Sequence, residues 1–476
     1  MGTPAGRWVL ITTVLGSGLA LLDSTVVNVA LERIGSDFGA SFAGLQWTVN
    51  AYTLTLAGFI LLGGSLGDRF GRRRIFLIGV VWFAVASALC GFAPSIEVLV
   101  ASRALQGIGG ALLTPGSLAL ISASFHGTDR AAAIGAWSGL AGVAGAVGPF
   151  IGGWLVEWNW RAVFLINLPL AAVVLVAAVR HVPESRDDRA VQHLDVPGTV
   201  LALLGLGALT WSLTEAGSAG ASTAVLTTGA VGLAALVAFA LVERRSRSPL
   251  VPPDLFANPR FTALNIVTLL MYAALGVLFV LLVLQLQVVA GFSPLGAGVS
   301  TLPITLVMLL LSARAGRLAA RIGPRIPMTV GLVVAAGGML LLTRIGPDAS
   351  YWTEVLPAVL LFALGLSATV APLTATVLDA ADDRHAGVAS GVNNAVARAA
   401  GLLSVAVIPA VSGISGADYT DPVSFSAGYH RAVVIAACLL LGAAALTLGL
   451  VRTPARPETE HPHSCDVTGP RPHPPT

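Results

Sequence analysis

Long apolar runs separated by short polar segments fill the chain from Trp8 to Val451. A helix needs about 20 mostly apolar residues to cross the roughly 30 Å hydrocarbon core of a bilayer. Fourteen runs of this kind can be delimited, at residues 8–30, 42–63, 75–94, 98–124, 131–154, 162–180, 196–214, 222–242, 261–289, 295–313, 327–344, 354–377, 388–411 and 430–451. The pattern predicts an all-α polytopic membrane protein with 14 transmembrane helices.

Arginines gather in the segments that follow even-numbered runs. The second, eighth and tenth runs are each followed by four of them, namely Arg69, Arg72, Arg73 and Arg74, then Arg244, Arg245, Arg247 and Arg260, then Arg314, Arg317, Arg321 and Arg325. The segment after the third run, around Pro94–Glu97, has none. Because arginine-rich segments stay in the cytoplasm, the pattern predicts a multi-pass protein of the inner (cytoplasmic) cell membrane with both termini cytoplasmic.

The composition agrees with a chain whose surface faces lipid. Of the 476 residues, 55% are hydrophobic and only 11% are charged, whereas about 25% are charged in soluble domains. The net charge of +3 gives no reason to expect a nucleic-acid partner. Every basic residue is arginine, so a P-loop lysine is absent and ATP hydrolysis by that route is excluded. Uphill transport would therefore draw on an ion gradient or on a separate subunit.

Motifs for metal binding and catalysis are absent from the sequence. Cys90, Cys438 and Cys465 have no metal-ligand spacing, so we expect no metal and no other cofactor. Gly63-Gly64-Ser65-Leu66-Gly67 matches the hydrolase pattern G-x-S-x-G, but that motif needs a strand-to-helix turn and here it ends an apolar run. We expect a protein that is not an enzyme.

A short motif recurs eight runs apart. In Gly67-Asp68-Arg69-Phe70-Gly71-Arg72-Arg73 and Ala319-Ala320-Arg321-Ile322-Gly323-Pro324-Arg325, Arg69, Gly71 and Arg73 are in register with Arg321, Gly323 and Arg325. Repeats of this kind mark transporters built from two similar halves. Two six-helix halves would place the copies six runs apart, so two runs are inserted. We expect bundles at 1–185 and 256–451, an inserted helix pair with linker at 186–255, and a disordered cytoplasmic tail at 452–476.

Several further motifs follow one another in a characteristic order. They are Leu22–Leu31 in the first run, Gly63–Arg74 after the second, Arg103, Gln106, Gly107, Gly109 and Gly110 in the fourth, Gly148–Gly153 in the fifth, Ser293-Pro294, Gly298 and Pro303 in the ninth-to-tenth region, and Gly387–Arg398 in the thirteenth. Together they resemble the fourteen-span drug:proton antiporter branch of the major facilitator superfamily. The resemblance covers nearly the whole chain and implies the major facilitator fold, arranged as six plus two plus six helices.

Three charged residues lie well inside predicted spans, away from the span ends, where charges are costly and mark functional sites. Asp23, in the first span, is our candidate for carrying the proton and for recognising a cationic group; an acid held permanently by a structural partner is the alternative. Arg103, in the fourth span, needs an acceptor, and Asp23 or backbone carbonyls are the available ones. The resemblance implies that Arg103 couples to proton movement. For Arg398 in the thirteenth span, structural and functional roles stay open.

The loop Gly67–Arg74 is the candidate cytoplasmic gate. Gly67 and Gly71 permit a tight turn because glycine tolerates positive φ. We expect Asp68 to pair with a loop arginine (Arg69, Arg72 or Arg73) or with Arg130, forming a charge latch that breaks as the halves move. In the second half, Arg321 and Gly323 match this motif, but Ala320 stands where the family has an acid.

Small residues follow one face of the fifth span. Gly148, Pro149, Gly152 and Gly153 would let helices approach closely, with Pro149 bending the helix. The resemblance adds that this antiporter helix seals the protein against proton leak. Several polar residues could line a substrate cavity, although periodicity does not select among them: Asn28, Gln46, Asn50, Tyr52, Asn265, Gln285 and Gln287.

These features favour a secondary active transporter, a proton-coupled antiporter that exports amphipathic drugs or antibiotics by alternating access. The expected partners are a small amphipathic substrate, protons and the lipid bilayer, and we expect the protein to work as a monomer. The alternative within transport is a permease for uptake or facilitated passage of a small metabolite. Asp23 and the Gly-Pro pattern of the fifth span favour export.

Overall fold

The computed structural model describes residues 4–125, 127–186, 195–246, 251, 253–380, 386–415 and 421–451, and the predicted tail at 452–476 lies outside them. Within these ranges the protein is helical and contains no strand. The helices are α1 (Pro4–Phe38), α2 (Phe42–Phe70), α3 (Arg72–Gly91), α4 (Ile96–Ser124), α5 (Gly127–Trp158), α6 (Ala162–Leu165), α7 (Asn167–His181), α8 (Val196–Ala219), α9 (Thr223–Arg245), α10 (Asp254–Ala257), α11 (Pro259–Leu284), α12 (Pro294–Ile322), α13 (Arg325–Leu341), α14 (Leu356–Asp379), α15 (Ala386–Val411) and α16 (Pro422–Leu450). Single π-helical turns, Gln285–Val289 and Tyr351–Val355, extend α11 and precede α14.

Each predicted span lies on one helix or on two consecutive ones, although α1, α2, α12 and α16 extend well beyond the predicted runs at one end. By length and hydropathy, 12 helices of the described chain could cross a membrane, and α2, which is bent by 48° near Leu61, makes 13. The remaining predicted span, 131–154, lies inside the continuous helix α5 but is not among these. The helical membrane architecture is confirmed, whereas the prediction of 14 spans is met by 12 or 13 on this criterion.

Local chemistry explains where several helices begin and end. Ser41, Ser95 and Ser293 are N-caps, and each hydroxyl accepts a hydrogen bond from a backbone N–H of the first turn. These bonds satisfy donors that the helix itself leaves unpaired. Gly71 ends α2 at φ +108° and Gly323 ends α12 at φ +87°, backbone conformations that residues with a Cβ rarely adopt.

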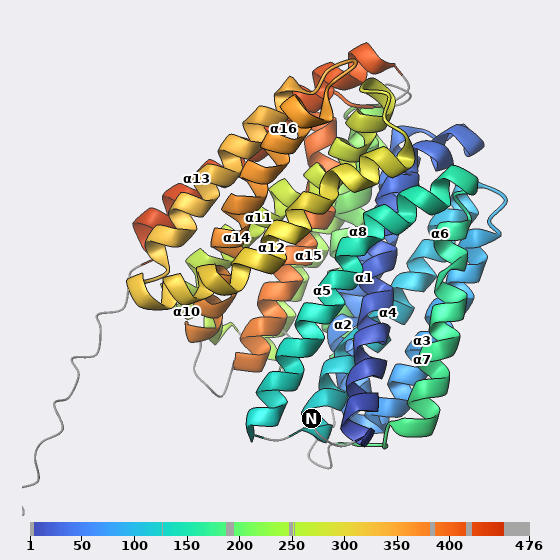
Figure 1. Ribbon diagram of the computed structural model, residues 1–476, viewed down its shortest axis with the longest axis vertical. Helices are drawn as coiled ribbons and strands as arrows, with labels where there is room; N and C mark the ends of the chain where they lie inside the picture. The colour runs from blue at the N-terminus through green and yellow to red at the C-terminus, as the bar shows by residue number, and fades with distance from the viewer. Residues whose placement is uncertain are drawn as a thin grey trace, which may run out of the picture.

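The helices form two bundles that meet along a seam (Figure 1). In the first half, α1 packs on α5 and α7, and α4 packs on α2 and α3; in the second, α13 and α14 pack together and α11 packs on α15 and α16. The seam consists of α5 against α12, α1 against α11 and α2 against α15. The pair α8 and α9 forms a hairpin whose α8 contacts both α2 and α15.

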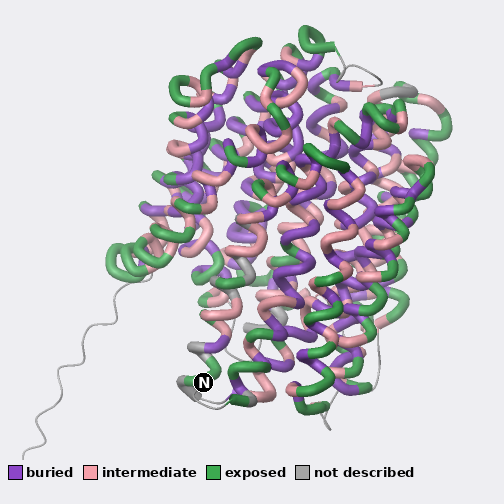
Figure 2. Tube along the Cα trace, turned by 45° about the vertical axis from the view of Figure 1, so that its right-hand side comes forward, coloured by how far each residue is buried: buried purple, intermediate pink, exposed green. Residues whose placement is uncertain are grey.

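Many large apolar side chains are exposed on the described helices, as contact with lipid requires. Figure 2 shows exposed residues along the outer faces of the helices. Helix α9 is the least buried of the candidate membrane-spanning helices. Leu226, Val231 and Leu233 on it are exposed, and only 11% of its most apolar 18 residues are buried. Its partner α8 separates it from the rest of the bundle. The inserted pair therefore lies at the periphery of the molecule.

Glycines set the spacing of α13 and α14. A Cβ added at Gly338 would lie 2.3 Å from the backbone N of Phe362, and one at Gly365 would lie 2.3 Å from the backbone N of Ala335. These distances are shorter than any real Cβ contact, so the two backbones are as close as glycine allows. Van der Waals packing of this kind drives helix association where lipid removes the hydrophobic driving force.

We expect Gly338→Ala to destabilise the second bundle by about 1–3 kcal/mol, since the added methyl group overpacks the α13–α14 contact. The apparent Tm of the purified protein in detergent should fall by several degrees. Gly449→Ala is the matched control, because nothing lies within 4 Å of a Cβ at that position. An unchanged Tm for Gly338→Ala would show that this contact does not limit stability.

Candidate functional site

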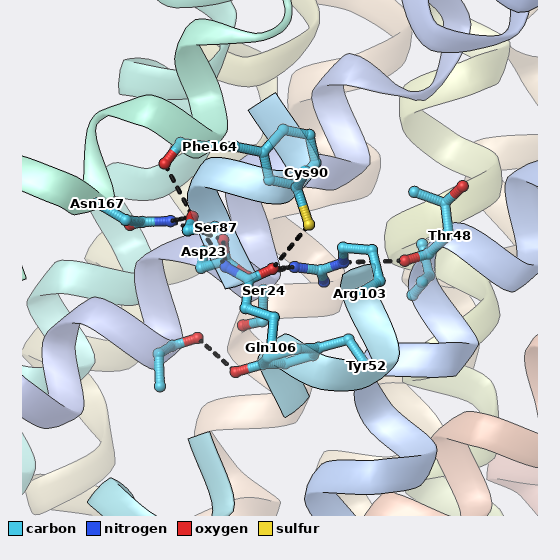
Figure 3. A network of polar contacts seen from close by, with 12 residues as sticks. Asp23, Ser24, Thr48, Tyr52, Ser87, Cys90, Arg103, Gln106, Phe164 and Asn167 are labelled. Carbon is cyan, nitrogen blue, oxygen red and sulfur yellow. Dashed lines mark hydrogen bonds and ion pairs between the residues drawn. The ribbon is translucent and has the colours of Figure 1, made fainter. Parts of the chain in front are cut away.

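An ion pair lies at the centre of the first bundle, between α1 and α4 (Figure 3). Arg103 Nη1 is 2.5 Å from Asp23 Oδ2, and the two side chains are 1% and 0% exposed. The structure thus brings together the two charged residues of the first half that the sequence placed at membrane depth. Bringing a charge out of water costs several kcal/mol per ion, so a pair this deep needs further polar partners.

Amide side chains supply those partners. Gln106 Nε2 and Asn167 Nδ2 each donate to Asp23 Oδ1 at 2.8 Å. Arg103 donates from Nε to the carbonyl of Thr48 at 3.0 Å, and from Nη1 to Gln106 Oε1 at 2.6 Å. Both oxygens of the acid and two nitrogens of the arginine are therefore bonded within one bundle, by groups from α1, α2, α4 and α7.

Two aromatic rings enclose the arginine. The guanidinium carbon of Arg103 lies 4.3 Å from the ring centre of Tyr52 and 5.8 Å from that of Phe164. The Tyr52 hydroxyl donates to the carbonyl of Ala20 at 3.3 Å, which fixes the ring across the gap from α2 to α1. Because Tyr52 also lines a cavity, its ring lies between the ion pair and the space where a substrate could bind.

Two neighbouring cavities lie along the seam. The first, of about 320 Å³, is lined from both halves by residues that include Asn28, Asn50 and Thr301. The second, of about 460 Å³, lies nearer the end of the bundle that carries the loop after α2, which we call the arginine-rich end, and includes Tyr52 and Ser390. Ser24 and Arg398 line both cavities.

The polar candidates divide into three groups. Asn28 and Asn50 line the first cavity and Tyr52 lines the second. Gln46 and Gln287 instead tie the halves together: Gln46 donates to the carbonyl of Val405, and Gln287 donates to that of Val29 at 3.1 Å. Asn265 and Gln285 are buried inside the second half, where Gln285 donates to the carbonyl of Ile345 at 2.8 Å.

The loop after α2 contains one expected ion pair. Arg72 binds Asp68, with Nη2 and Nε each 2.8 Å from Oδ1. Arg130 is not part of it, and its Nη2 instead donates to the hydroxyl of Ser122 at 3.2 Å. The Arg69 guanidinium lies 5.2 Å from the centre of the Phe70 ring. Of the two loop glycines, Gly71 has positive φ, but Gly67 lies inside α2 in helical conformation, so the prediction of a turn at Gly67 is wrong.

Glu184, which the sequence did not single out, completes this loop. Its carboxylate accepts hydrogen bonds from the backbone N–H groups of Arg73 at 3.0 Å and of Arg74 at 3.1 Å. The acid lies beside the N-terminus of α3, where the helix dipole favours negative charge. A Cβ at Gly71 would lie 2.9 Å from the Glu184 carboxylate, so the glycine also makes room for it. An acid just after an apolar run was the available signal.

The second half repeats this geometry in part. Arg73 Nη1 donates to the carbonyl of Val182 at 2.9 Å, just after α7, and Arg325 Nε donates to that of Leu448 at 2.7 Å, near the end of α16. In each half, the third residue of the repeat thus binds the end of the last helix of its bundle. Arg321 is exposed, and Gly323 has the same left-handed conformation as Gly71.

Helix α5 is packed between the two halves through its small residues. A Cβ at Gly148 would lie 1.9 Å from Thr25 Oγ1, and one at Gly152 would lie 3.0 Å from Val26 on the same helix, α1. On the other face, a Cβ at Gly153 would lie 2.5 Å from Leu295 Cα in α12. The carbonyl of Pro149 is equally close to α12, lying 2.1 Å from a Cβ built at Gly298.

Comparison with known proteins gives a consistent result. The family model described as Major Facilitator Superfamily matches residues 13–405. The puromycin resistance protein pur8 of Streptomyces alboniger is 38% identical over 98% of this chain and 96% of its own length. The tetracenomycin C resistance and export protein of Streptomyces glaucescens is 36% identical over 84% of this chain and 74% of its own length.

A solved structure supports the fold. A bacterial homologue of the human lysosomal transporter Spinster superposes with a TM-score of 0.67 at 18% identity, covering 94% of this chain and 97% of that one. At this level of identity the likeness concerns the fold alone. It agrees with the two-bundle architecture described above.

We expect Glu184→Ala to loosen the N-terminus of α3, because two backbone N–H groups lose their acceptor. Loss of a helix cap costs about 1 kcal/mol, so amide hydrogen exchange at residues 73 and 74 should become several-fold faster. Glu157→Ala, which removes an exposed acid at the end of α5, is the control. Equal exchange rates in wild type and Glu184→Ala would mean that water caps this helix equally well.

Proposed function

The chain belongs to the major facilitator superfamily, and from this premise we propose that it is a proton-coupled antiporter that exports amphipathic drugs or antibiotics. The relatives named for resistance and export support the direction and the substrate class. The observation that carries the coupling is the buried Asp23–Arg103 pair, separated by Tyr52 from a cavity that both halves line.

Protonation of Asp23 would change this network in a defined way. The ionised acid accepts three hydrogen bonds, from Arg103, Gln106 and Asn167. A proton on either oxygen cancels the attraction to Arg103 and leaves that guanidinium as an uncompensated buried charge, which costs several kcal/mol. The polar groups of α1, α2, α4 and α7 must then rearrange. We infer that this rearrangement links proton binding to movement of the first bundle.

Movement of the two bundles, 1–185 and 256–451, about the seam would give alternating access. Contacts of α5 with α12 and of Gln287 with Val29 close the seam at the end opposite the arginine-rich end. The second cavity extends toward the arginine-rich end. With that end cytoplasmic, as the arginine distribution predicts, we infer an inward-open arrangement. The Asp68–Arg72 pair joins α2 to α3 within the first half and does not bridge the two halves.

The available driving force is sufficient for export. A membrane potential supplies about 2.3 kcal/mol per charge per 100 mV. One proton entering can therefore sustain a substrate gradient of more than about tenfold, at 1.4 kcal/mol per decade. We place the transporter in the bacterial cell membrane, with both termini cytoplasmic and with one chain as the working unit. Export requires no bond-making chemistry on the substrate, so the protein acts as a transporter and not as an enzyme.

Asp23→Asn should abolish proton-driven export. The amide cannot carry a proton through the cycle, so substrate accumulation in inverted vesicles driven by a pH gradient should fall to the level of empty vesicles. Exchange of labelled for unlabelled substrate across the same vesicles needs no net proton movement and should persist, which establishes that the variant is folded. Accumulation at the wild-type rate in Asp23→Asn would eliminate this residue as the proton site.

Asp23→Glu and Glu157→Gln complete this experiment. The glutamate keeps a titratable group beside Arg103, so we expect partial recovery of accumulation. Glu157→Gln neutralises an exposed acid at the end of α5 and should leave both assays unchanged. Loss of accumulation in the Glu157 variant would show that the assay responds to charge in general.

Gly153→Leu should hold the seam open between α5 and α12. The larger side chain overpacks the contact with Leu295 by about 1–3 kcal/mol, which changes the population of the closed arrangement about 5- to 150-fold. Export should slow while a cysteine placed at Thr301, in a cysteine-free background, becomes reactive toward maleimide from outside. Gly135→Leu is the control on the same helix, since nothing lies within 4 Å of its Cβ. Identical labelling in the two variants contradicts the proposed closure.

A further inference from the structure

Arg398 on α15 is a cation at membrane depth without a partner in the described part of the chain. Its side chain makes no hydrogen bond or ion pair with any described residue, and its Nε is buried away from every acceptor. Among the described residues, the ionisable side chains close enough to act on it electrostatically are Tyr52 and Tyr272, and both are phenols, which ordinarily carry no charge at physiological pH. An arginine keeps its charge in a protein, so Arg398 presents a positive charge that no described residue balances.

Arg103, the other arginine at membrane depth in this chain, has acceptors for its guanidinium group. It has an acid at 2.5 Å, a backbone carbonyl at 3.0 Å and an amide oxygen at 2.6 Å. Arg398 has none of these and lines both cavities of the seam. The charge without a partner, that of Arg398, therefore lies at the cavities where a substrate would bind and not in the interior of a bundle.

No acid is among the described residues that line the two cavities around Arg398. The described lining of the first cavity is aliphatic and aromatic, including Val280, Leu402 and Phe279, with amides at Asn28 and Asn50. The side-chain oxygens of Asn28 and Asn50 are buried without a hydrogen-bond partner. The cavity therefore offers one positive charge, unpaired amide groups and a large apolar surface.

We propose that the exported compounds carry an acidic group, such as a carboxylate, a sulfonate or an acidic enol or phenol, on an apolar ring system, and that Arg398 is its counter-ion. This inference rests on the proposed export function and specifies its substrate class. Guanidinium groups bind planar anions through two parallel hydrogen bonds, and the amides take the polar substituents of the rings. Asp23 does not recognise a cationic substrate, because Arg103, Gln106 and Asn167 occupy its oxygens inside the first bundle.

The test uses two fluorescent probes that differ in one charge. Anilinonaphthalenesulfonate is an anion, and phenylnaphthylamine is the same ring system without the sulfonate. Binding of each is titrated to the protein in phosphatidylcholine nanodiscs, with empty nanodiscs subtracted. Arg398→Gln should weaken binding of the sulfonate about tenfold or more, as expected for loss of one charge-assisted pair, and should leave phenylnaphthylamine affinity within about twofold. Arg398→Lys should restore part of the sulfonate affinity.

Arg314→Gln provides the matched control, since it removes an exposed arginine from α12 that donates to its own helix. A loss of affinity that is equal for both probes in Arg398→Gln, or no loss for either, overturns the proposal. A second measurement on the wild-type protein decides the question if Arg398→Gln does not fold. Naphthalenesulfonate should displace bound phenylnaphthylamine better than naphthyltrimethylammonium does, and the opposite order overturns the proposal.

These binding assays need no proton gradient, so they separate this inference from the proposed function. Selective sulfonate binding in a protein that does not export either probe from proton-energised vesicles supports the role of Arg398 and counts against antiport. Export of phenylnaphthylamine that is indifferent to Arg398, with no preference for anions in binding, supports antiport and overturns the role of Arg398.

Discussion

The ion pair between Asp23 and Arg103 is the interaction on which the first bundle depends. Each charge buried at this depth costs several kcal/mol unless it is paired and hydrogen-bonded, and here both are. The acid on α1 binds groups from α4 and α7, and the arginine reaches the backbone of α2 at Thr48. The four helices cannot shift relative to one another without breaking charge-assisted bonds. A change in the protonation of one carboxylate is therefore felt by all of them at once.

The second constraint is steric and acts between the halves. Because lipid tails are themselves apolar, the hydrophobic effect does not drive helices together within the membrane. Close packing of small residues must therefore stabilise the contact between the halves. Helix α5 meets α1 through Gly148 and Gly152 and meets α12 through Gly153. One helix thus adjoins the bundle that holds the ion pair and the bundle that forms the opposite wall of the cavity. A shift of α1 around Asp23 would therefore be passed through α5 to the contact between the two halves.

Much of this architecture was predictable from the sequence, because transmembrane helices need long apolar runs and costly charges within them stand out. The positions of the helices, the repeated loop and the pairing partners available to Arg103 follow from those rules. The sequence did not show how each helix is rotated about its own axis, and this rotation decides which neighbours a side chain contacts. Gln46 and Asn50 are one turn apart, yet Gln46 binds across the seam and Asn50 lines the cavity. Glu184 was missed because its partners, the N–H groups of α3, are more than 100 residues away, and Gly67 was assigned to a turn that Gly71 makes alone.

In the proposed antiport mechanism, the two arginines at membrane depth, Arg103 and Arg398, have different roles. The hydrogen bonds and ion pair of Arg103 are all made within the protein, and the ring of Tyr52 lies between Arg103 and the cavity. A proton is small enough to pass this ring and reach Asp23, whereas a substrate is not. Arg398 lines both cavities and has no hydrogen-bond or ion-pair partner among the described residues. Tyr52 lines the cavity on one side and stacks on Arg103 on the other. In the proposed mechanism, a ligand at Arg398 shares a cavity with Tyr52, and Tyr52 in turn packs on Arg103 beside the proposed proton site. Occupancy of one site would therefore alter the free energy of the other.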